Sequence, residues 1–483
     1  MHTKLIFKIL GLLLMVFSLT LIPPIIIAVI YDDGGLIEFS FSLLFLLIFG
    51  ILMWYPSRRD KHELKIRDGF LIVVMFWSVL GFVGAIPIYF STTILISATD
   101  AIFESFSALT TTGATVMTGL ETLPHALLWY RQQLQWLGGM GIIVLAVAIL
   151  PMLGIGGMQL YRAESPGPVK DSKLAPRISE TAKALWYIYL GLTISCAVSF
   201  KLAGMNWFDA FAHSFSTVAI GGFSTYDGSI GHFQSLNIEI VAMVFMVLAG
   251  INFALHFVSF RNRSISAYRL DPEVKVYTGV LLFGIALSTL YLTLNSVYPT
   301  WQESLRYGAF QTISLATTTG FSSTNYAVWP VFLPVFLLLM GFIGGCAGST
   351  AGGMKVIRII LLAKQGNREI KRLLHPNALM PIKLSGKVVP DRVLTAVWGF
   401  FALYIVSFMS IMLLLMLLGL DQVTALSAVT ATINNIGPGL GEVATNYQNV
   451  SDPVKWVLTF TMLLGRLEIF TLLVLFTAAF WRK

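Results

Sequence analysis

The chain has 483 residues, of which 56% are hydrophobic and only 12% are charged, and its mean hydropathy is +0.79. Soluble proteins carry about 25% charged residues. The composition therefore excludes a soluble enzyme, a disordered chain and a nucleic-acid-binding protein, and it predicts an all-α polytopic membrane protein. The two cysteines, Cys196 and Cys346, lie far apart in apolar surroundings and have no spacing typical of a metal site.

Ten segments are apolar enough to be membrane spans, which need about 20 mostly apolar residues each. They are residues 6–30, 39–54, 70–90, 133–153, 185–203, 238–260, 277–294, 331–362, 393–419 and 454–480. Of the 32 Lys and Arg residues, 27 fall at the two chain ends or in alternate loops. Because cytoplasmic loops are enriched in these residues, we expect ten spans with both termini in the cytoplasm. The net charge of +8 then reflects membrane orientation.

Four segments between the spans share a pattern, an apolar stretch that ends in small polar residues and glycine. These segments are 100–113, 209–222, 309–320 and 421–437. The first two align without a gap, Asp100 on Asp209 and Gly113 on Gly222. The pattern predicts a fourfold repeat of span, short helix, glycine turn and span around a central pore. The expected units are a two-span segment (1–69) and four pore repeats (70–160, 161–262, 263–375 and 376–483).

The short segments are too short to cross a bilayer, so we expect them to be re-entrant helices that line a water-filled path. Their C-terminal ends carry partial negative charge, and backbone carbonyls in the turns can replace the water around an ion. The expected ligands are the carbonyls of Thr111, Thr112, Gly113, Ile220, Gly221, Gly222, Thr318, Thr319, Gly320, Asn435, Ile436 and Gly437. No carboxylates cluster there, which favours a monovalent cation. The alternative is four ordinary extracellular turns.

Five motifs together give a specific resemblance to a known family. They are Thr-Thr-Thr-Gly-Ala (110–114), Ala-Ile-Gly-Gly-Phe-Ser-Thr (219–225), Ala-Thr-Thr-Thr-Gly-Phe (316–321), Asn-Asn-Ile-Gly-Pro-Gly (434–439) and Gly-Arg-Leu-Glu (465–468). The chain resembles, over its whole length, the Trk-type potassium uptake subunits of the Trk/Ktr/HKT superfamily. The resemblance implies K⁺ uptake across the bacterial inner membrane through a filter with one key glycine per repeat. In related transporters, serine at the position of Gly113 is associated with Na⁺ transport. The glycine found here therefore implies a preference for K⁺. The fourth motif departs by inserting residues before Gly437.

The eighth span is interrupted by small residues, among them Gly344, Gly345, Gly348, Ser349, Thr350, Gly352 and Gly353. So many glycines should break a helix in mid-membrane. From the residues alone, this stretch is either a flexible loop across the ion path or a site of close helix packing. The family resemblance implies the first, an intramembrane gating loop.

Arg466 is the one Lys or Arg deep within a span, and such a charge is a functional hypothesis by default. It would project into the path below the filter and repel cations. The alternative is an ion pair, but the nearby Glu468 is two residues away and does not share its helix face.

The basic inner loop 363–392 is explained by topology or lipid attraction alone. The resemblance implies in addition a homodimer and a soluble regulatory subunit that binds nucleotide. This chain has no phosphate-binding motif of its own, so nucleotide sensing is expected in that partner. The transported K⁺ is the expected ion, with no organic cofactor. The other functions considered are a K⁺/H⁺ or Na⁺-coupled carrier and an intramembrane enzyme. No nucleophile, base or metal cluster suggests the enzyme.

Overall fold

The computed structural model describes residues 2–60, 65–141 and 178–482. The regular secondary structure of its described part is helical apart from one hairpin, in which β1 (Lys383–Leu384) pairs antiparallel with β2 (Lys387–Val388). Many helices are long and apolar with side chains exposed on their outer faces, as expected where lipid takes the place of water. The predicted fold class, an all-α polytopic membrane protein, is confirmed.

The chain begins with two antiparallel helical spans. The first is α1 (Thr3–Leu19) followed by α2 (Ile22–Tyr31), which together are long enough to cross a membrane, and the second is α3 (Leu36–Trp54). The two prolines in the first turn of α2 explain the break, since proline lacks the N–H that would continue the preceding helix. α1 packs against α3 where Gly11 meets Gly50, and a Cβ on either glycine would crowd the backbone of the other helix.

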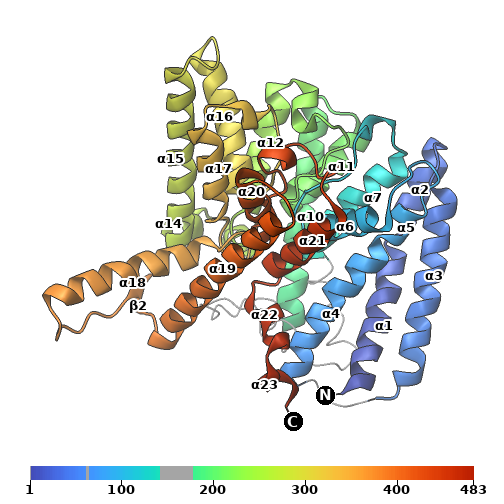
Figure 1. Ribbon diagram of the computed structural model, residues 1–483, viewed down its shortest axis with the longest axis horizontal. Helices are drawn as coiled ribbons and strands as arrows, with labels where there is room; N and C mark the ends of the chain where they lie inside the picture. Colours follow the sequence, from blue (N-terminus) through green and yellow to red (C-terminus); the bar gives the residue numbers. More distant parts are fainter. Residues whose placement is uncertain (1, 61–64, 142–177, 483) are drawn as a thin grey trace.

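The rest of the chain repeats one arrangement four times (Figure 1). Each unit starts with a long helix: α4 (Ile66–Gly84), α10 (Ile178–Leu202), α15 (Pro272–Leu294) and α19 (Asp391–Leu417). A short helix follows: α6 (Ala98–Leu109), α11 (Trp207–Ala219), α16 (Trp301–Ala316) and α20 (Gln422–Ile433). A return helix completes the unit: α7 (His125–Trp136), α12 (Leu236–Ala249), α17 (Phe332–Gly341) and α21 (Asp452–Arg466). In every unit the short helix packs against both of the others.

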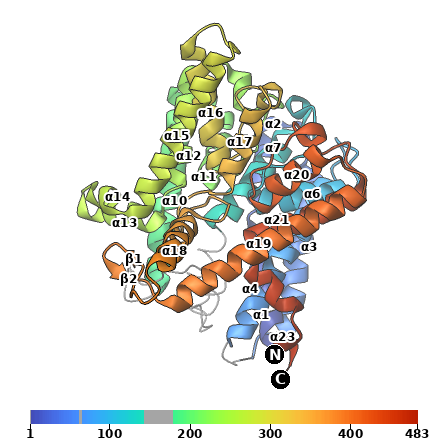
Figure 2. The same ribbon diagram turned by 60° about the vertical axis from the view of Figure 1, so that its left-hand side comes forward.

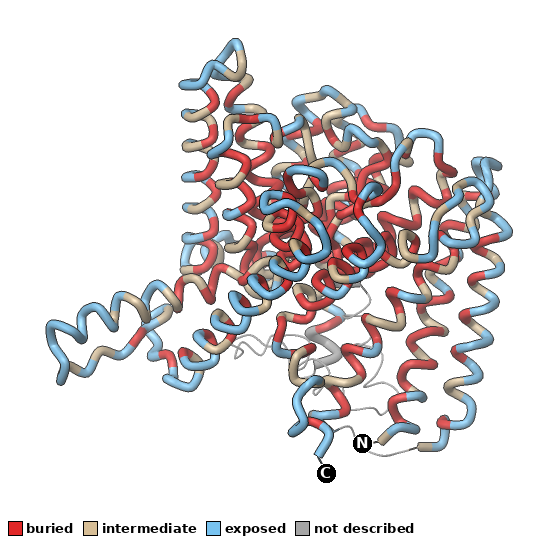
Figure 3. The backbone as a smooth tube through the Cα atoms, viewed as in Figure 1, coloured by how far each residue is buried: buried red, intermediate tan, exposed pale blue. Residues whose placement is uncertain are grey.

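Contacts between units close a ring. The return helix of each unit packs against the short helix of the next: α7 against α11, α12 against α16, and α17 against α20. The ring closes because α21 packs against α6, although these helices are more than 340 residues apart in sequence (Figure 2). Burial is greatest where the four short helices meet, at the centre of the molecule (Figure 3).

Further helices and turns join and extend the helices of the four units. The further α-helices are α5 (Ile86–Tyr89), α13 (Phe253–Asn262), α14 (Ser266–Leu270), α18 (Val356–Leu374), α22 (Phe470–Leu473) and α23 (Ala478–Trp481). Single 3₁₀ turns are η1 (Tyr55–Ser57), η2 (Leu120–Thr122), η4 (Ser229–Phe233), η5 (Tyr326–Val328), η6 (Gly441–Val443) and η7 (Val474–Phe476). α7 continues as a π-helix, Leu137–Gly141. Figure 1 shows α18 extending away from the helical body and the two chain ends lying close together.

Three of the expected spans are not continuous helices, and the break in 331–362 falls where its glycines predicted one. Span 238–260 bends by 95° between α12 and α13, and span 454–480 bends by 108° after α21. At the first bend the Asn252 side chain accepts the Ala254 N–H and starts a new helix. At the second, Glu468 and Ile469 both have positive φ. Span 331–362 is divided into α17 and α18 by a non-helical stretch, 342–355.

The described residues contain six helices that could each cross a membrane, or eight if each bent pair counts as one span. These eight correspond to eight of the ten expected spans. The other two are 331–362, which is divided, and 133–153, which extends beyond the described residues.

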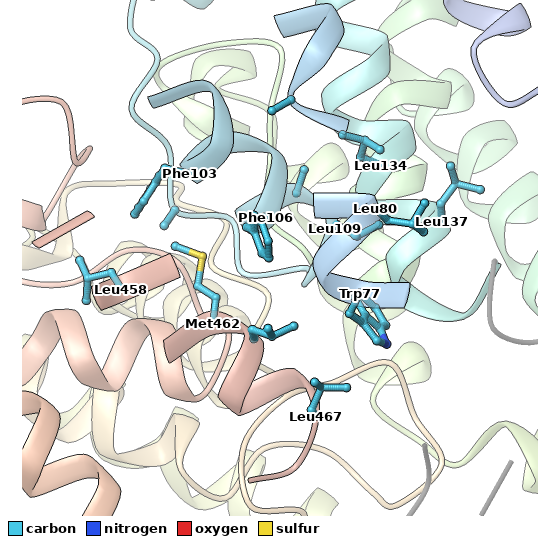
Figure 4. Close-up of a cluster of buried hydrophobic side chains, with 14 of the residues drawn as sticks. Trp77, Leu80, Phe103, Phe106, Leu109, Leu134, Leu137, Leu458, Met462 and Leu467 are labelled. Atoms are coloured by element: carbon cyan, nitrogen blue, oxygen red, sulfur yellow. The ribbon is translucent and has the colours of Figure 1, made fainter. Parts of the chain in front are cut away.

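The first and fourth units share an apolar core, which fixes the helices around their glycine turns. Figure 4 shows Trp77 of α4, Phe106 of α6, Leu134 of α7 and Met462 of α21 meeting in one cluster, all of them buried. Between helices in a membrane, close packing of such side chains contributes van der Waals attraction, so this core holds α21 against α6 and keeps the ring closed.

Candidate functional site

The four short helices begin in the same way. A side-chain oxygen at each N-terminus accepts backbone N–H groups of the first turn, which removes unsatisfied donors from the helix end. The capping residues are Ser97, Asn206, Thr300 and Asp421. The helices have 12, 13, 16 and 12 residues, so none is long enough to cross a bilayer. α16 begins at Trp301, eight residues before the start of the apolar segment 309–320.

The four glycine turns follow these helices and share one backbone geometry. They are turn 1 (111–113), turn 2 (220–222), turn 3 (318–320) and turn 4 (435–437). The first residue of each turn has positive φ: Thr111 55°, Ile220 56°, Thr318 67° and Asn435 53°. So does each final glycine: Gly113 82°, Gly222 77°, Gly320 83° and Gly437 96°.

One hydrogen bond recurs in all four turns. The N–H of the middle residue (Thr112, Gly221, Thr319 or Ile436) donates to the carbonyl five residues earlier, at 2.7–2.9 Å. This is the Schellman type of helix ending. The insertion before Gly437 therefore does not shift turn 4 out of register with the other three.

The glycines bring the four turns into direct contact. A Cβ on Gly113 would overlap the Gly221 carbonyl oxygen, and one on Gly222 would overlap that of Thr319. Likewise a Cβ on Gly320 would overlap the Ile436 oxygen, and one on Gly437 would lie 2.6 Å from that of Thr112. Each turn thus lies against the next, and turn 4 lies against turn 1. The twelve residues chosen from the sequence form one closed ring of backbone.

The ring is electronegative by construction. Four helix C-termini point toward it, each with about half a unit of negative charge. The Thr, Ile and Asn side chains of the turns are buried, and the hydroxyls of Thr112 and Thr319 bond to other threonines at 2.8 Å. Carbonyl oxygens rather than carboxylates are therefore what these turns offer to a cation.

Turn 4 is supported by side chains that the sequence analysis missed. Tyr447 donates to the Gly437 carbonyl at 2.8 Å, and Tyr326 donates to the Gly439 carbonyl at 2.9 Å. The Asn435 amide donates to Thr112 Oγ1 at 2.8 Å and so joins turn 4 to turn 1. Nothing in the local sequence pairs these residues, because the tyrosines come from other segments of the chain.

The glycine-rich stretch 342–355 belongs to the third unit and also contacts the second and fourth units. The Gly352 N–H donates to Thr318 Oγ1 (2.7 Å), and the Gly353 N–H donates to the Asn434 carbonyl (3.2 Å). The buried Thr350 hydroxyl donates to the Val218 carbonyl at the end of α11 (3.0 Å), and its own carbonyl accepts from Arg466.

The expected loop residues contact one another and the bend in the second unit. A Cβ on Gly344 would overlap the Gly352 carbonyl, one on Gly345 would crowd Ala351, and one on Gly353 would crowd Gly344. The Gly348 carbonyl accepts the Phe253 N–H (3.0 Å), and Ser349 donates to the Cys346 carbonyl (2.6 Å). The Cys346 N–H donates to the Gly250 carbonyl (2.8 Å). The loop therefore inserts between α12 and α13, which explains the bend there.

Arg466 ends α21 directly below turn 1. Its guanidinium donates to Thr111 Oγ1 (3.3 Å), to the Thr350 carbonyl (3.3 Å) and to the carbonyls of Gly138 and Gly139 (2.5 and 2.7 Å). These bonds connect a glycine turn, the glycine-rich loop and the π-helix after α7. Glu468 forms an ion pair with Arg358 of α18, a partner 110 residues away.

Two buried carboxylates were also missed. Glu104 of α6 pairs with Arg131 of α7 beside turn 1. Glu273 of α15 accepts the N–H groups of Ala347 (2.7 Å), within the glycine-rich loop, and of Ile357 (3.0 Å), in the first turn of α18. The sequence did not single out either one, because the partners of each lie far away in sequence.

The profile of the TrkH family, described as cation transport proteins, matches residues 37–483. The chain belongs to this family. It is 57% identical to the Trk system potassium uptake protein TrkH of Vibrio parahaemolyticus and 54% identical to that of Escherichia coli, with each chain covered in full. It is 40% identical to TrkG of Escherichia coli over 100% of this chain and 99% of that one. The crystal structure of the potassium transporter TrkH from Vibrio parahaemolyticus matches with a TM-score of 0.91 and 53% identity over both full chains.

Membership of the TrkH family confirms the resemblance drawn from the five motifs. The relatives are named as uptake proteins of a transport system, which sets aside the alternative of an intramembrane enzyme. The chain is a multi-pass membrane protein of a transporter family.

Proposed function

We propose that this chain is the membrane subunit of a potassium uptake system and that K⁺ passes through the ring of four glycine turns. The observation that carries this proposal is the closed ring itself, in which four equivalent turns meet through their glycines. Carbonyls of residues 111–113, 220–222, 318–320 and 435–437 would replace the water around the ion. The potassium named for the related TrkH and TrkG proteins supports the same ion here.

The ring favours K⁺ because each turn ends in a residue without a Cβ. Gly113 packs against the Gly221 carbonyl, so a larger residue would push turns 1 and 2 apart. The spacing of the carbonyls decides how well they match an ion of a given size, and serine at this position should weaken the preference for K⁺.

The glycine-rich loop and Arg466 are proposed to control the flow of ions. Loop residues contact the second, third and fourth units, and Arg466 bonds to Thr111 of the first unit as well as to the loop. A loop below the ring, secured by a positive charge, would hold the path closed until it moves.

The remaining proposals concern the setting of the protein. Positive charge is concentrated on the side that carries both termini and the loop 363–392, which supports a cytoplasmic location for them in a bacterial inner membrane. The exposed basic helix α18 is a candidate surface for a cytosolic nucleotide-binding regulatory subunit, and the assembly is proposed to be a homodimer.

The test is uptake of ⁸⁶Rb⁺ into liposomes that carry the purified protein, with K⁺ or Na⁺ in competition and Gly113→Ser alongside. We expect K⁺ to compete, Na⁺ not to compete, and Gly113→Ser to lose this difference. If the protein carries no Rb⁺, either alone or with its cytosolic partner added, the proposal is wrong.

A further inference from the structure

Helix α7 carries side chains that hold the backbone of turn 2. Gln135 Nε2 donates to the Gly221 carbonyl at 2.6 Å, and its Oε1 accepts the Phe223 N–H at 3.1 Å. Gln132 donates to the Phe223 carbonyl at 3.2 Å. One helix of the first unit therefore fixes three backbone groups of the second unit, one of which is an expected ion ligand.

One turn earlier on the same face, Arg131 forms an ion pair with Glu104 of α6. Arg131 Nε and Nη2 lie 2.8 and 2.6 Å from Glu104 Oε1, and the two side chains are 1% and 0% exposed. Glu104 Oε2 also accepts the Val116 N–H at 3.0 Å, and both Glu104 oxygens accept the Thr115 hydroxyl. The pair thus fixes the position of the irregular segment that follows turn 1.

Arg131 extends from this pair to turn 2. Its Nη1 donates to the Ser224 carbonyl at 3.4 Å, and its guanidinium lies 4.3 Å from the centre of the Phe223 ring. The segments that follow turns 1 and 2 are connected by three side chains, Glu104, Arg131 and Gln135. We refer to these three residues as the α7 brace.

A fully buried ion pair is costly to desolvate, and apolar residues of similar volume often give equal or greater stability. Stability alone therefore does not account for the position of Glu104 and Arg131. The planar guanidinium, with donors fixed relative to one another, is suited to setting a distance between two backbones.

We propose that the α7 brace sets the spacing between turns 1 and 2 and thereby determines how well the ring discriminates K⁺ from Na⁺. These are positioning residues, since none of them supplies an ion ligand. The inference rests on the proposed function, because it concerns the selectivity of the same ring.

A second arginine–glutamate pair offers a matched control. Arg306 of α16 bonds to Glu239 of α12 at 2.7 and 2.8 Å, and the pair joins the second and third units. Arg306 is 25% exposed, and its guanidinium donates to Glu239 rather than to a glycine turn. Removing this pair tests the loss of an ion pair between units without the loss of contacts to the ring.

The experiment compares E104Q/R131Q with E239Q/R306Q in liposomes. Both double variants retain the net charge, and they make the same two side-chain changes. The readout is the ratio of the Na⁺ and K⁺ concentrations that halve ⁸⁶Rb⁺ uptake, together with the maximal rate. We expect E104Q/R131Q to lower this ratio about tenfold. A tenfold change corresponds to about 1.4 kcal/mol, which is close to the contribution of one hydrogen bond to a charged group. We expect E239Q/R306Q to leave it unchanged.

A purely structural role would lower the amount of folded protein and the maximal rate, but not the ratio. An unchanged ratio in E104Q/R131Q, beside a K⁺-selective parent, overturns the brace and leaves the proposed function intact. If the double variant does not assemble, Gln135→Met decides, because it removes one hydrogen bond to turn 2 and one to the following Phe223 without disturbing a charge. A K⁺ preference unchanged in Gln135→Met then overturns the proposal. A parent protein without any K⁺ preference instead contradicts the proposed function itself.

Discussion

At the scale of single residues, Arg466 contacts both a glycine turn and the glycine-rich loop, so in the proposed function one charge acts on both. Its guanidinium contacts Thr111 of turn 1 and the Thr350 carbonyl of the loop. A unit charge about 10 Å from an ion, at an effective dielectric constant of about 20, raises the energy of that ion by about 1.7 kcal/mol. This is enough to slow passage more than tenfold.

We therefore expect Arg466→Met to raise the initial rate of ⁸⁶Rb⁺ uptake by about tenfold. The substitution removes both the charge and the bonds that secure the loop. The control is Arg306→Met, which removes an arginine whose bonds go to Glu239. An Arg466→Met protein that folds and transports at the original rate would show that this charge is not a barrier.

At the scale of elements, the glycine-rich loop depends on close backbone contacts. A Cβ on Gly352 would overlap the Asn434 carbonyl just before turn 4. By contrast, Gly366 on α18 has open space where its Cβ would be. The two positions separate a change in loop contacts from the general effect of replacing a glycine.

We expect Gly352→Ala to displace the loop and increase uptake in the absence of any partner, whereas Gly366→Ala has no effect. The measurement is the basal ⁸⁶Rb⁺ uptake of each variant relative to the parent protein. Equal basal rates for all three proteins would count against a loop that closes the path.

The sequence was informative where chemistry is local. Glycine spacing located all four turns, and the apolar runs located the short and long helices. The direction of each helix could not be predicted, because hydropathy reports composition and not geometry. The bends at Asn252 and Glu468 were therefore missed. Pairings across long separations, such as Glu104 with Arg131 beside the ring, were missed for the same reason.

At the scale of the whole molecule, the orientation proposed from Lys and Arg can be tested chemically. Leu95, before α6, is fully exposed, and Leu379, after α18, is 98% exposed. The native Cys196 and Cys346 are buried, so they should react slowly with thiol reagents. A cysteine introduced at either leucine can therefore be labelled selectively.

We expect a membrane-impermeant maleimide to label Leu95→Cys in intact cells and Leu379→Cys only after permeabilisation. The reason is that the proposed topology puts the first position outside and the second in the cytoplasm. Labelling of Leu379→Cys in intact cells to the same extent would contradict the assignment of both termini to the cytoplasm.

The central claim is that four equivalent glycine turns form one selective ring, and the most direct test is to alter each turn in the same way. Gly113→Ala, Gly222→Ala, Gly320→Ala and Gly437→Ala each put a methyl group against a carbonyl of the next turn. Gly279→Ala, in open space on α15, is the control. The measurement is the preference for K⁺ over Na⁺ in competition with ⁸⁶Rb⁺ uptake. The ring predicts that all four variants lose this preference while the control retains it, and four variants as selective as the control would contradict it.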